Sequence, residues 1–225
     1  MKGRDGVGKN LIIIGCGGHS KVIVDIIEHM PQFRILGLID DDPVRPSHFQ
    51  GYPVLGDTAS IKTIKEPVFG GIIGIGDNWS RKKVADVIKK SNPNFPFITI
   101  IHPTAYVSPR CHIGAGTAIM AGAIINSDVS IGEHCIVNTL GSVAHDCVIG
   151  DYSSVGPGAH LGGNVVIGDN SAVSLGARIL HGRTIGDHTV VGAGATVTKD
   201  FGDLGVVYGA PAKWIRPRLQ EETYL

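Results

Sequence analysis

The chain has 225 residues, of which 43% are hydrophobic, so it is long enough for one large domain or two small ones with a sizeable core. Its formal net charge is zero, which gives no electrostatic case for nucleic acid or an anionic membrane surface as a partner. The 32 glycines are spread through a sequence without low-complexity stretches, which indicates many special backbone positions rather than disorder.

The N-terminal segment 3–10, GRDGVGKN, is similar to a phosphate-binding loop, but we expect a disordered tail there. No strand pattern precedes it, and Asn10 stands where such a loop needs a serine or threonine for magnesium. The N-terminus has no small-residue cleavage site, and the apolar run 11–14 is too short for secretion or for a membrane span. The four cysteines fit no zinc or CxxC spacing, so reduced thiols and a cytoplasmic protein are expected.

Residues 1–100 alternate between strand and helix patterns. Apolar strand candidates lie within 11–14, 34–42 and 68–78, and helical spacing appears in 22–27 and 81–90. Strands that alternate with helices predict a small Rossmann-like α/β domain with a parallel sheet.

Polar residues follow each of these strands at its carboxyl end, where ligands bind in parallel α/β sheets. They are the glycine turn 15–19, the pair Asp40–Asp41, and Gly76–Asn78. The turn lacks the third glycine of a dinucleotide fingerprint because Ser20 stands there. Taken alone, it is better explained as a tight connection beside a solvated His19. The three strand ends together favour a ligand, with a phosphate at the N-terminus of the following helix.

A six-residue repeat occupies the second part of the chain. Counting by six from Val107 to Val197, all sixteen positions are Val, Ile or Leu. The residue two places before each is usually small, and the residue after it is often glycine. Two inward side chains followed by a tight corner explain this pattern, and three such strands make a coil of 18 residues. The repeat predicts a parallel β-helix over residues 101–225, and the small inward position explains three cysteines as core residues: Cys111, Cys135 and Cys147.

His145 and Asp146 fall at a corner of this coil, two residues after the inward Val143. A carboxylate beside an imidazole can orient the ring and stabilise its protonated form, which is a general-base arrangement. Gly163 and His181 follow in the same corner column, and Gly163 leaves a bare backbone for a thin ligand. A solvated His–Asp pair explains the dipeptide equally well. Most other histidines of the repeat are expected to be ordinary solvated residues: His112, His134, His160 and His188.

Motifs spread over nearly the whole chain resemble one known family. They are GCGGHSK (15–21), IDDD (39–42), IGDNWSRKK (75–83), IHPTAYVSP (101–109), NTLGSVAHDCVIGD (138–151) and GAPAKWIR (209–216), together with the repeat. The chain is similar to bacterial acetyl-CoA-dependent N-acetyltransferases that modify nucleotide-linked 4-amino sugars. Sialic acid O-acetyltransferases share the layout, and O-acetylation of such a sugar is the alternative activity.

This resemblance implies a left-handed β-helix and a homotrimer with active sites between subunits. His145 matches the catalytic base and Asp146 the acid beside it, so that His145 takes a proton from the attacking amine without an acyl-enzyme intermediate. Acetyl-CoA, the co-substrate, would lie along the coils. The matching cofactor positions are Gly163 and Ala193, with Lys213 as a partner for a CoA phosphate or, alternatively, as a solvated side chain.

The resemblance also assigns a nucleotide-sugar pocket to the α/β domain. The matching positions are Gly17, Gly18, His19, Asp40 and Asp41, with Asp77 and Arg81 as weaker candidates. One residue departs from the family: Ser154 stands where some members have a second histidine, which bears on the identity of the acceptor.

Two other classes of function make different predictions for this sequence. A zinc hydrolyase on the same β-helix needs converging histidines, but His145 and His181 are two coils apart, about 10 Å. That is too far to share an ion whose ligands lie at about 2.0–2.1 Å, so no metal is expected. A purely structural role predicts no binding of acetyl-CoA and a harmless His145→Ala substitution.

Overall fold

The computed structural model describes residues 8–224, and its first part is the expected α/β unit. Its elements are β1 (Lys9–Ile14), α1 (Gly18–Glu28), β2 (Phe33–Ile39), β3 (His48–Phe49), β4 (Tyr52–Pro53), the 3-10 helix η1 (Thr58–Thr63), β5 (Gly70–Ile73) and α2 (Asn78–Ser91). Strands β2, β1 and β5 form a parallel sheet in that order, and β3 and β4 form a small antiparallel hairpin.

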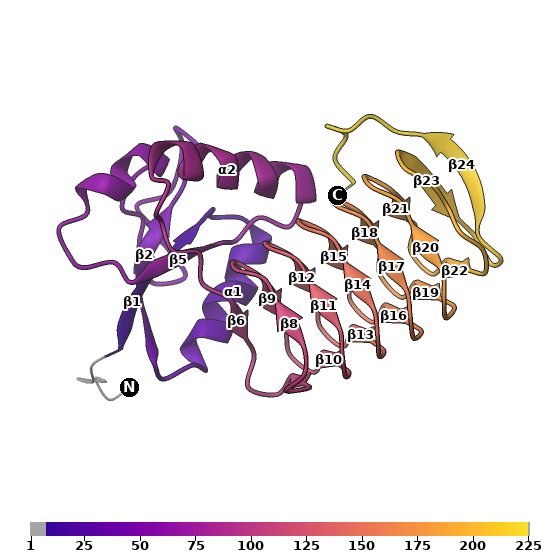
Figure 1. Ribbon diagram of the computed structural model, residues 1–225. Helices are drawn as coiled ribbons and strands as arrows, with labels where there is room; N and C mark the ends of the chain where they lie inside the picture. Colours follow the sequence, from indigo (N-terminus) through magenta and orange to yellow (C-terminus); the bar gives the residue numbers. More distant parts are fainter. Residues whose placement is uncertain (1–7, 225) are drawn as a thin grey trace.

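The two faces of this sheet are covered by different helices (Figure 1). Leu11 and Ile13 of β1 belong to the apolar core that contains Ile23 and Ile27 of α1. Ile12 and Ile14, on the opposite face, share a second core with Ala85 and Ile88 of α2. A central strand buried on both faces reads as a continuous apolar run, which explains the pattern of residues 11–14.

The prediction of a disordered tail over residues 3–10 is wrong for its last two residues. Lys9 and Asn10 open β1, where they pair with Phe33 and Arg34 of β2. Residues 3–7 of the glycine-rich segment lie outside the described residues.

The second part of the chain is a left-handed parallel β-helix with three faces (Figure 1). The first face contains β7 (Tyr106–Val107), β10 (Ile124–Ile125), β13 (Ser142–Val143), β16 (His160–Leu161), β19 (Arg178–Ile179) and β22 (Thr196–Val197). The second face contains β8 (His112–Ile113), β11 (Ser130–Ile131), β14 (Val148–Ile149), β17 (Val166–Ile167) and β20 (Thr184–Ile185). The third face contains β6 (Ile100–Ile101), β9 (Ala118–Ile119), β12 (Ile136–Val137), β15 (Ser154–Val155), β18 (Ala172–Val173), β21 (Val190–Val191), β23 (Gly205–Tyr208) and β24 (Lys213–Pro217).

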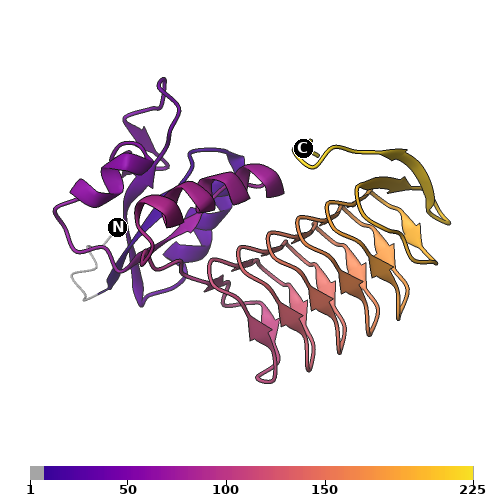
Figure 2. The same cartoon turned by 45° about the horizontal axis from the view of Figure 1, so that its top comes forward.

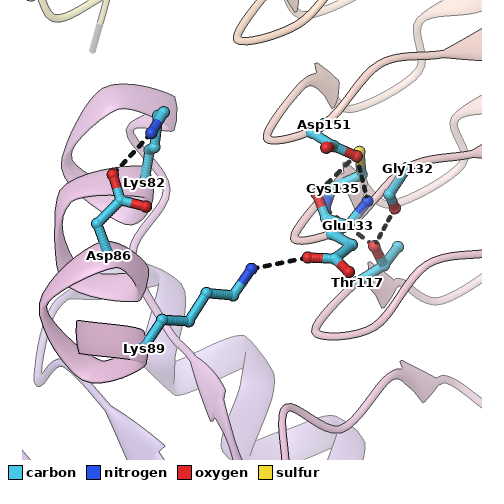
Figure 3. Close-up of polar contacts among 8 residues, drawn as sticks. All are labelled: Lys82, Asp86, Lys89, Thr117, Gly132, Glu133, Cys135 and Asp151. Atoms are coloured by element: carbon cyan, nitrogen blue, oxygen red, sulfur yellow. Dashed lines mark hydrogen bonds and ion pairs between the residues drawn. The ribbon is translucent and has the colours of Figure 1, made fainter. Parts of the chain in front are cut away.

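Small inward side chains do more than fill space, because they also donate hydrogen bonds. Thr117 Oγ1 donates to the carbonyl of Gly132 at 2.9 Å (Figure 3). Cys135 Sγ donates to the carbonyl of Gly150 at 3.1 Å. Burial raises the pKa of Cys135 to about 12, which keeps it a thiol. All four cysteines are free. The cysteines at this position are therefore core residues that also satisfy corner carbonyls of the backbone.

One corner column carries a ladder of aspartates. Asp151 Oδ1 accepts a hydrogen bond from the backbone N–H of Glu133 at 2.7 Å (Figure 3). Asp169, Asp187 and Asp203 repeat the contact, each accepting at 2.8 Å from the N–H of the aspartate in the preceding coil. Each coil thus caps the corner of the coil before it.

The two parts of the chain share cores rather than touching loosely. Outward residues of the third face, Ile100, Ala118 and Ile136, are 0%, 2% and 4% exposed because they pack in the core of α1. On the other side, Lys89 Nζ of α2 reaches Glu133 Oε2 at 2.8 Å (Figure 3).

His134 is buried at this junction, which corrects the expectation of a solvated histidine. Its ring stacks on Tyr152 with a centroid distance of 5.1 Å and meets the edge of Phe97 at 4.5 Å. Burial, and the nearby charge of Lys89, lower the pKa of His134 to about 4. The six-residue pattern places this histidine at a corner, but Phe97 and α2 cover that corner.

The C-terminal tail runs back from β24 toward the α/β part (Figures 1 and 2). Arg218 Nη1 donates to the carbonyl of His188 at 3.1 Å, and Tyr224 reaches Gly76 and Asn78. Among residues 8–224, no helix combines the length and apolar character that crossing a membrane requires.

Candidate functional site

The carboxyl ends of β1, β2 and β5 meet around a cavity of about 260 Å³. The glycine turn 15–19 forms one wall, and Gly74–Gly76 forms another. All five stronger sugar-pocket candidates line this cavity: Gly17, Gly18, His19, Asp40 and Asp41. The three strand ends singled out in the sequence therefore converge on one space.

The cavity combines hydrogen-bond donors with acidic acceptors. Gly17 is the N-cap of α1 and makes no side-chain cap, and the first turn carries no acid, so the helix presents free N–H groups and its positive dipole end. Asp40 lies beside this end, where its carboxylate accepts from the N–H of Cys16 at 2.6 Å and of Asp42 at 2.8 Å. Each carboxylate oxygen retains lone pairs for a further donor. The arrangement suits a ligand that carries both phosphate and hydroxyl groups.

His19 has a buried ring nitrogen without a hydrogen-bond partner among the described residues. This atom is Nε2, and the side chain lines the cavity of the glycine turn. Burial, and secondarily the charge of Arg81, lower the pKa of His19 to about 4, so the ring is neutral at neutral pH. A buried polar atom that lacks a partner costs free energy, which a bound ligand is able to recover.

A second, longer space of about 700 Å³ runs along the third face of the β-helix. It is lined by one residue from each of four successive coils, at 18-residue steps: Asn138, Gly156, Ser174 and Gly192. At strand spacing these coils span about 14 Å along the axis. Ala193 lies in the groove, and His19 and Gly76 line both the groove and the glycine-turn cavity. The two spaces therefore share a junction.

Arg81 and Asp77, the weaker sugar-pocket candidates, line neither space. Arg81 is 1% exposed, and all five of its N–H donors are used: Nε to the carbonyl of His134, Nη1 to those of Ile75 and Gly76, and Nη2 to Asn78 Oδ1 and the carbonyl of Tyr152. No donor remains for a substrate, so this arginine joins the two parts of the chain instead. Asp77 caps α2 by accepting from the N–H of Ser80 at 2.9 Å.

His145 and Asp146 form a hydrogen-bonded pair at the corner between β13 and β14. The distance from Nδ1 to Oδ2 is 2.7 Å, and the side chains are 62% and 53% exposed. Asp146 adopts a φ of 59°, and this bend brings the carboxylate back to the neighbouring ring. A carboxylate at Nδ1 fixes the tautomer with its proton there, which leaves the Nε2 lone pair free to accept a proton.

Gly163 is covered by this imidazole, not open to a ligand. A Cβ built on Gly163 would lie 2.6 Å from both Cε1 and Nε2 of His145. The 18-residue step predicts a bare backbone at Gly163 for a ligand, but the ring of His145 occupies that space. This contact holds His145 against the next coil.

One chain does not bring all of these residues together. His145 and Asp146 lie at the corner between the first and second faces, whereas the groove follows the third face. Neither pair member lines the groove or the cavity. Lys213 is exposed on β24. Within residues 8–224 no three His, Cys, Asp or Glu side chains are placed to hold a metal ion.

One residue at the junction of the spaces, Tyr224, was missed from the sequence, and it lies beside Ser154, whose departure from the family pattern the sequence shows. Tyr224 lines the groove, and its hydroxyl lies 2.8 Å from Oγ of Ser154, which also lines it. They are separated by 70 residues, and no periodicity or motif connects them.

Models of known protein families match both parts of the chain. The PglD N-terminal domain model matches residues 10–88, and the model for the bacterial transferase hexapeptide (six repeats) matches residues 146–174. A UDP-N-acetylbacillosamine N-acetyltransferase of Bacillus subtilis is 38% identical over 119 residues, which is 50% of this chain and 52% of that protein. The chain thus spans about half the length of this curated relative.

Solved structures match over nearly the full length. PerB from Caulobacter crescentus, in complex with CoA and GDP-perosamine, is 36% identical with a TM-score of 0.86, covering 94% of this chain and 99% of that one. The acetyltransferase domain of PglB from Neisseria gonorrhoeae, in complex with acetyl coenzyme A, is 32% identical with a TM-score of 0.84, covering 92% and 100%.

Proposed function

Because the chain belongs to the family of bacterial hexapeptide-repeat sugar N-acetyltransferases, we propose that it transfers the acetyl group of acetyl-CoA to the amino group of a nucleotide-linked 4-amino-deoxy sugar, for glycan synthesis. One observation carries this proposal. The cavity at the glycine turn and the groove along the coils share His19 and Gly76, so a nucleotide sugar in the first meets an acyl donor in the second.

The nucleotide part of the acceptor would bind at the glycine turn. The free N–H groups at the start of α1 suit its phosphates, and the lone pairs of Asp40 and Asp41 suit ribose hydroxyls. His19, neutral and with Nε2 unpartnered, would contact the ligand at the junction. The bound GDP-perosamine of the Caulobacter relative supports this class of acceptor.

Acetyl-CoA would lie along the groove of the third face. Gly156 and Gly192 contribute no side chain to the lining, and Ala193 adds only a small one, so a thin pantetheine chain fits against the coils. Lys213, exposed on β24, would pair with a CoA phosphate. Gly163 would act indirectly, by seating the ring of His145.

His145 would act as the general base, with Asp146 holding its tautomer. As the amine nitrogen forms its bond to the acetyl carbon, His145 Nε2 accepts the proton that the nitrogen loses. The carbon–sulfur bond then breaks, and the CoA thiolate leaves and takes up that proton. The amide and CoA are the products, and no acyl-enzyme forms.

The catalytic pair would come from a neighbouring copy in a homotrimer. His145 and Asp146 are exposed and lie on a different corner from the groove of their own chain. Such an arrangement is productive when the corner of one chain faces the groove of the next, as a cyclic assembly allows.

The substrate class is tested with an acetyl-transfer assay. Acetyl-CoA is supplied with UDP-, GDP- and dTDP-linked 4-amino sugars and, separately, with free sialic acid, and both CoA release and acetylated product are measured. We expect transfer to at least one nucleotide amino sugar and none to sialic acid. Transfer to sialic acid alone would establish O-acetylation and overturn the proposal.

The shared site is tested by mixing two inactive variants. His145→Ala lacks the base, and Ala193→Trp fills the groove, so each is expected to be inactive alone. When the two variants are coexpressed at equal levels and form cyclic trimers, about a quarter of the sites combine an intact groove with an intact base. Recovery of activity near that level supports the assembly, and no recovery would place both groups in one chain.

A further inference from the structure

We propose that Tyr224 is a sugar-binding residue, whose hydroxyl accepts a hydrogen bond from the acceptor sugar at the junction of the cavity and the groove. The inference rests on the proposed function and adds a residue that determines acceptor binding. Its basis is the position to which the C-terminal tail carries this tyrosine (Figures 1 and 2).

Three hydrogen-bond contacts fix the phenol at the junction. Its oxygen lies 2.8 Å from Oγ of Ser154, 3.2 Å from the carbonyl oxygen of Gly76 and 3.2 Å from Oδ1 of Asn78. Tyr224, Ser154 and Gly76 line the groove together with His19. The phenol thus joins the β-helix to the α/β part where the two spaces meet.

The direction of these bonds follows from which atoms are able to donate. The oxygens of Gly76 and Asn78 only accept, so the single phenol proton goes to one of them. Ser154 then donates to the phenol oxygen, because otherwise that oxygen would face two carbonyl oxygens without a proton between them. Burial raises the pKa of Tyr224, which keeps this proton in place.

A consequence of this direction is that the junction offers acceptors to a ligand. The phenol oxygen and the Ser154 oxygen each retain a lone pair, whereas their protons are already committed. They are suited to an O–H or N–H group of an amino sugar and not to its carbonyl or ether oxygens. Tyr224 lines the groove and not the cavity of the glycine turn, so a nucleotide bound in that cavity would not contact the phenol.

The tail is held in place without the phenol. Arg218 donates to the carbonyl of His188 at 3.1 Å and also to that of Glu222. Gln220 Nε2 lies 3.0 Å from Nε2 of His188, and Arg216 pairs with Glu222. Removing the hydroxyl of Tyr224 should therefore leave the tail where it is, so that a substitution reports on the hydroxyl alone.

The test compares Tyr224→Phe with wild type in two binding measurements and one kinetic one. Calorimetry gives the affinity for the nucleotide amino sugar and for the matching nucleoside diphosphate, and steady-state kinetics gives KM for the acceptor and for acetyl-CoA. We expect roughly 3–10-fold weaker binding of the amino sugar, the range for one neutral hydrogen bond, with the nucleoside diphosphate and the acetyl-CoA KM unchanged. The control is Tyr52→Phe, because Tyr52 donates to Glu28 at 2.9 Å in the hairpin, away from the groove.

Each other outcome counts against the proposal. Equal affinity of Tyr224→Phe and wild type for the amino sugar would overturn it. Equal weakening for the amino sugar and the nucleoside diphosphate would show that the tyrosine only supports the fold of the pocket. A wild-type protein that acetylates no nucleotide amino sugar would instead overturn the function on which the inference rests.

Discussion

Replacing Gly163 with alanine should displace His145, the proposed catalytic base, without disturbing the fold. The backbone of Gly163 has no positive φ, so alanine is tolerated there, and the three nearest atoms to its Cβ all belong to the ring of His145. That Cβ would lie 2.6 Å from Cε1 and Nε2, whereas ordinary contacts begin near 3.4 Å, so the ring must move by about 0.8 Å. The ring is at the exposed end of a side chain and is free to yield.

Such a displacement exceeds the roughly 0.5 Å within which catalytic groups must be held. It also stretches or breaks the 2.7 Å bond from His145 Nδ1 to Asp146. We expect kcat to fall about 100-fold, which corresponds to about 2.7 kcal/mol in the activation barrier. The midpoint of thermal unfolding should stay close to that of wild type.

The assay is acetyl transfer under saturating conditions, together with a double-mutant cycle. Gly202→Ala is the matched control, since nothing lies within 4 Å of its Cβ and its φ is not positive. If Gly163→Ala acts through His145, then adding it to His145→Ala should cause no further loss. Near wild-type kcat for Gly163→Ala, or a further loss in the double variant, would refute the reasoning.

Two further predictions concern stability. Arg81→Met should lower the free energy of unfolding by more than about 3 kcal/mol, because several buried acceptors lose their donor. Lys89→Met should lower it by less than about 1 kcal/mol, because the pair of Lys89 with Glu133 is half-exposed. Equal urea midpoints for the two variants would contradict this contrast. His19 and His134 have a pKa of about 4 when folded, against 6.5 as the ordinary value. Between these values the unfolded chain binds protons that the folded chain does not, so stability should fall with pH from 6.5 to 4 by up to about 1.4 kcal/mol per pH unit for each histidine. His134→Gln should make that slope shallower, and a wild-type stability that is level over this window would show that the folded histidines are not held neutral.

The sequence predicts most of the β-helix because its strand positions repeat locally. Every coil must turn its large aliphatic residue inward, and a single insertion would break that register. The pattern says nothing of what covers the outside. Ile136 is an outward residue and yet is buried under α1, and His134 lies under α2, since both depend on how a separate unit docks.

The candidate site likewise contains residues that the sequence predicts and residues that it does not. The glycine turn and Asp40 follow from strand ends, because parallel strands bring their carboxyl ends to one edge of a sheet. The role of Arg81 is not readable from its place in a helix, because its partners include His134 and Tyr152, 53 and 71 residues away. Tyr224 likewise depends on the path of an irregular tail, which no repeat or propensity determines.

The shared core between α1 and the third face also sets an order of events during synthesis. Ile23 and Ile27 of α1 share their core with Ile136, which is added more than a hundred residues later than they are. At translation rates of about 5–20 residues per second, that interval is roughly 5–20 s. Until Ile136 has been made, the side of α1 that packs on the third face lacks part of its core. The first coils therefore complete the core of the part of the chain that was made before them.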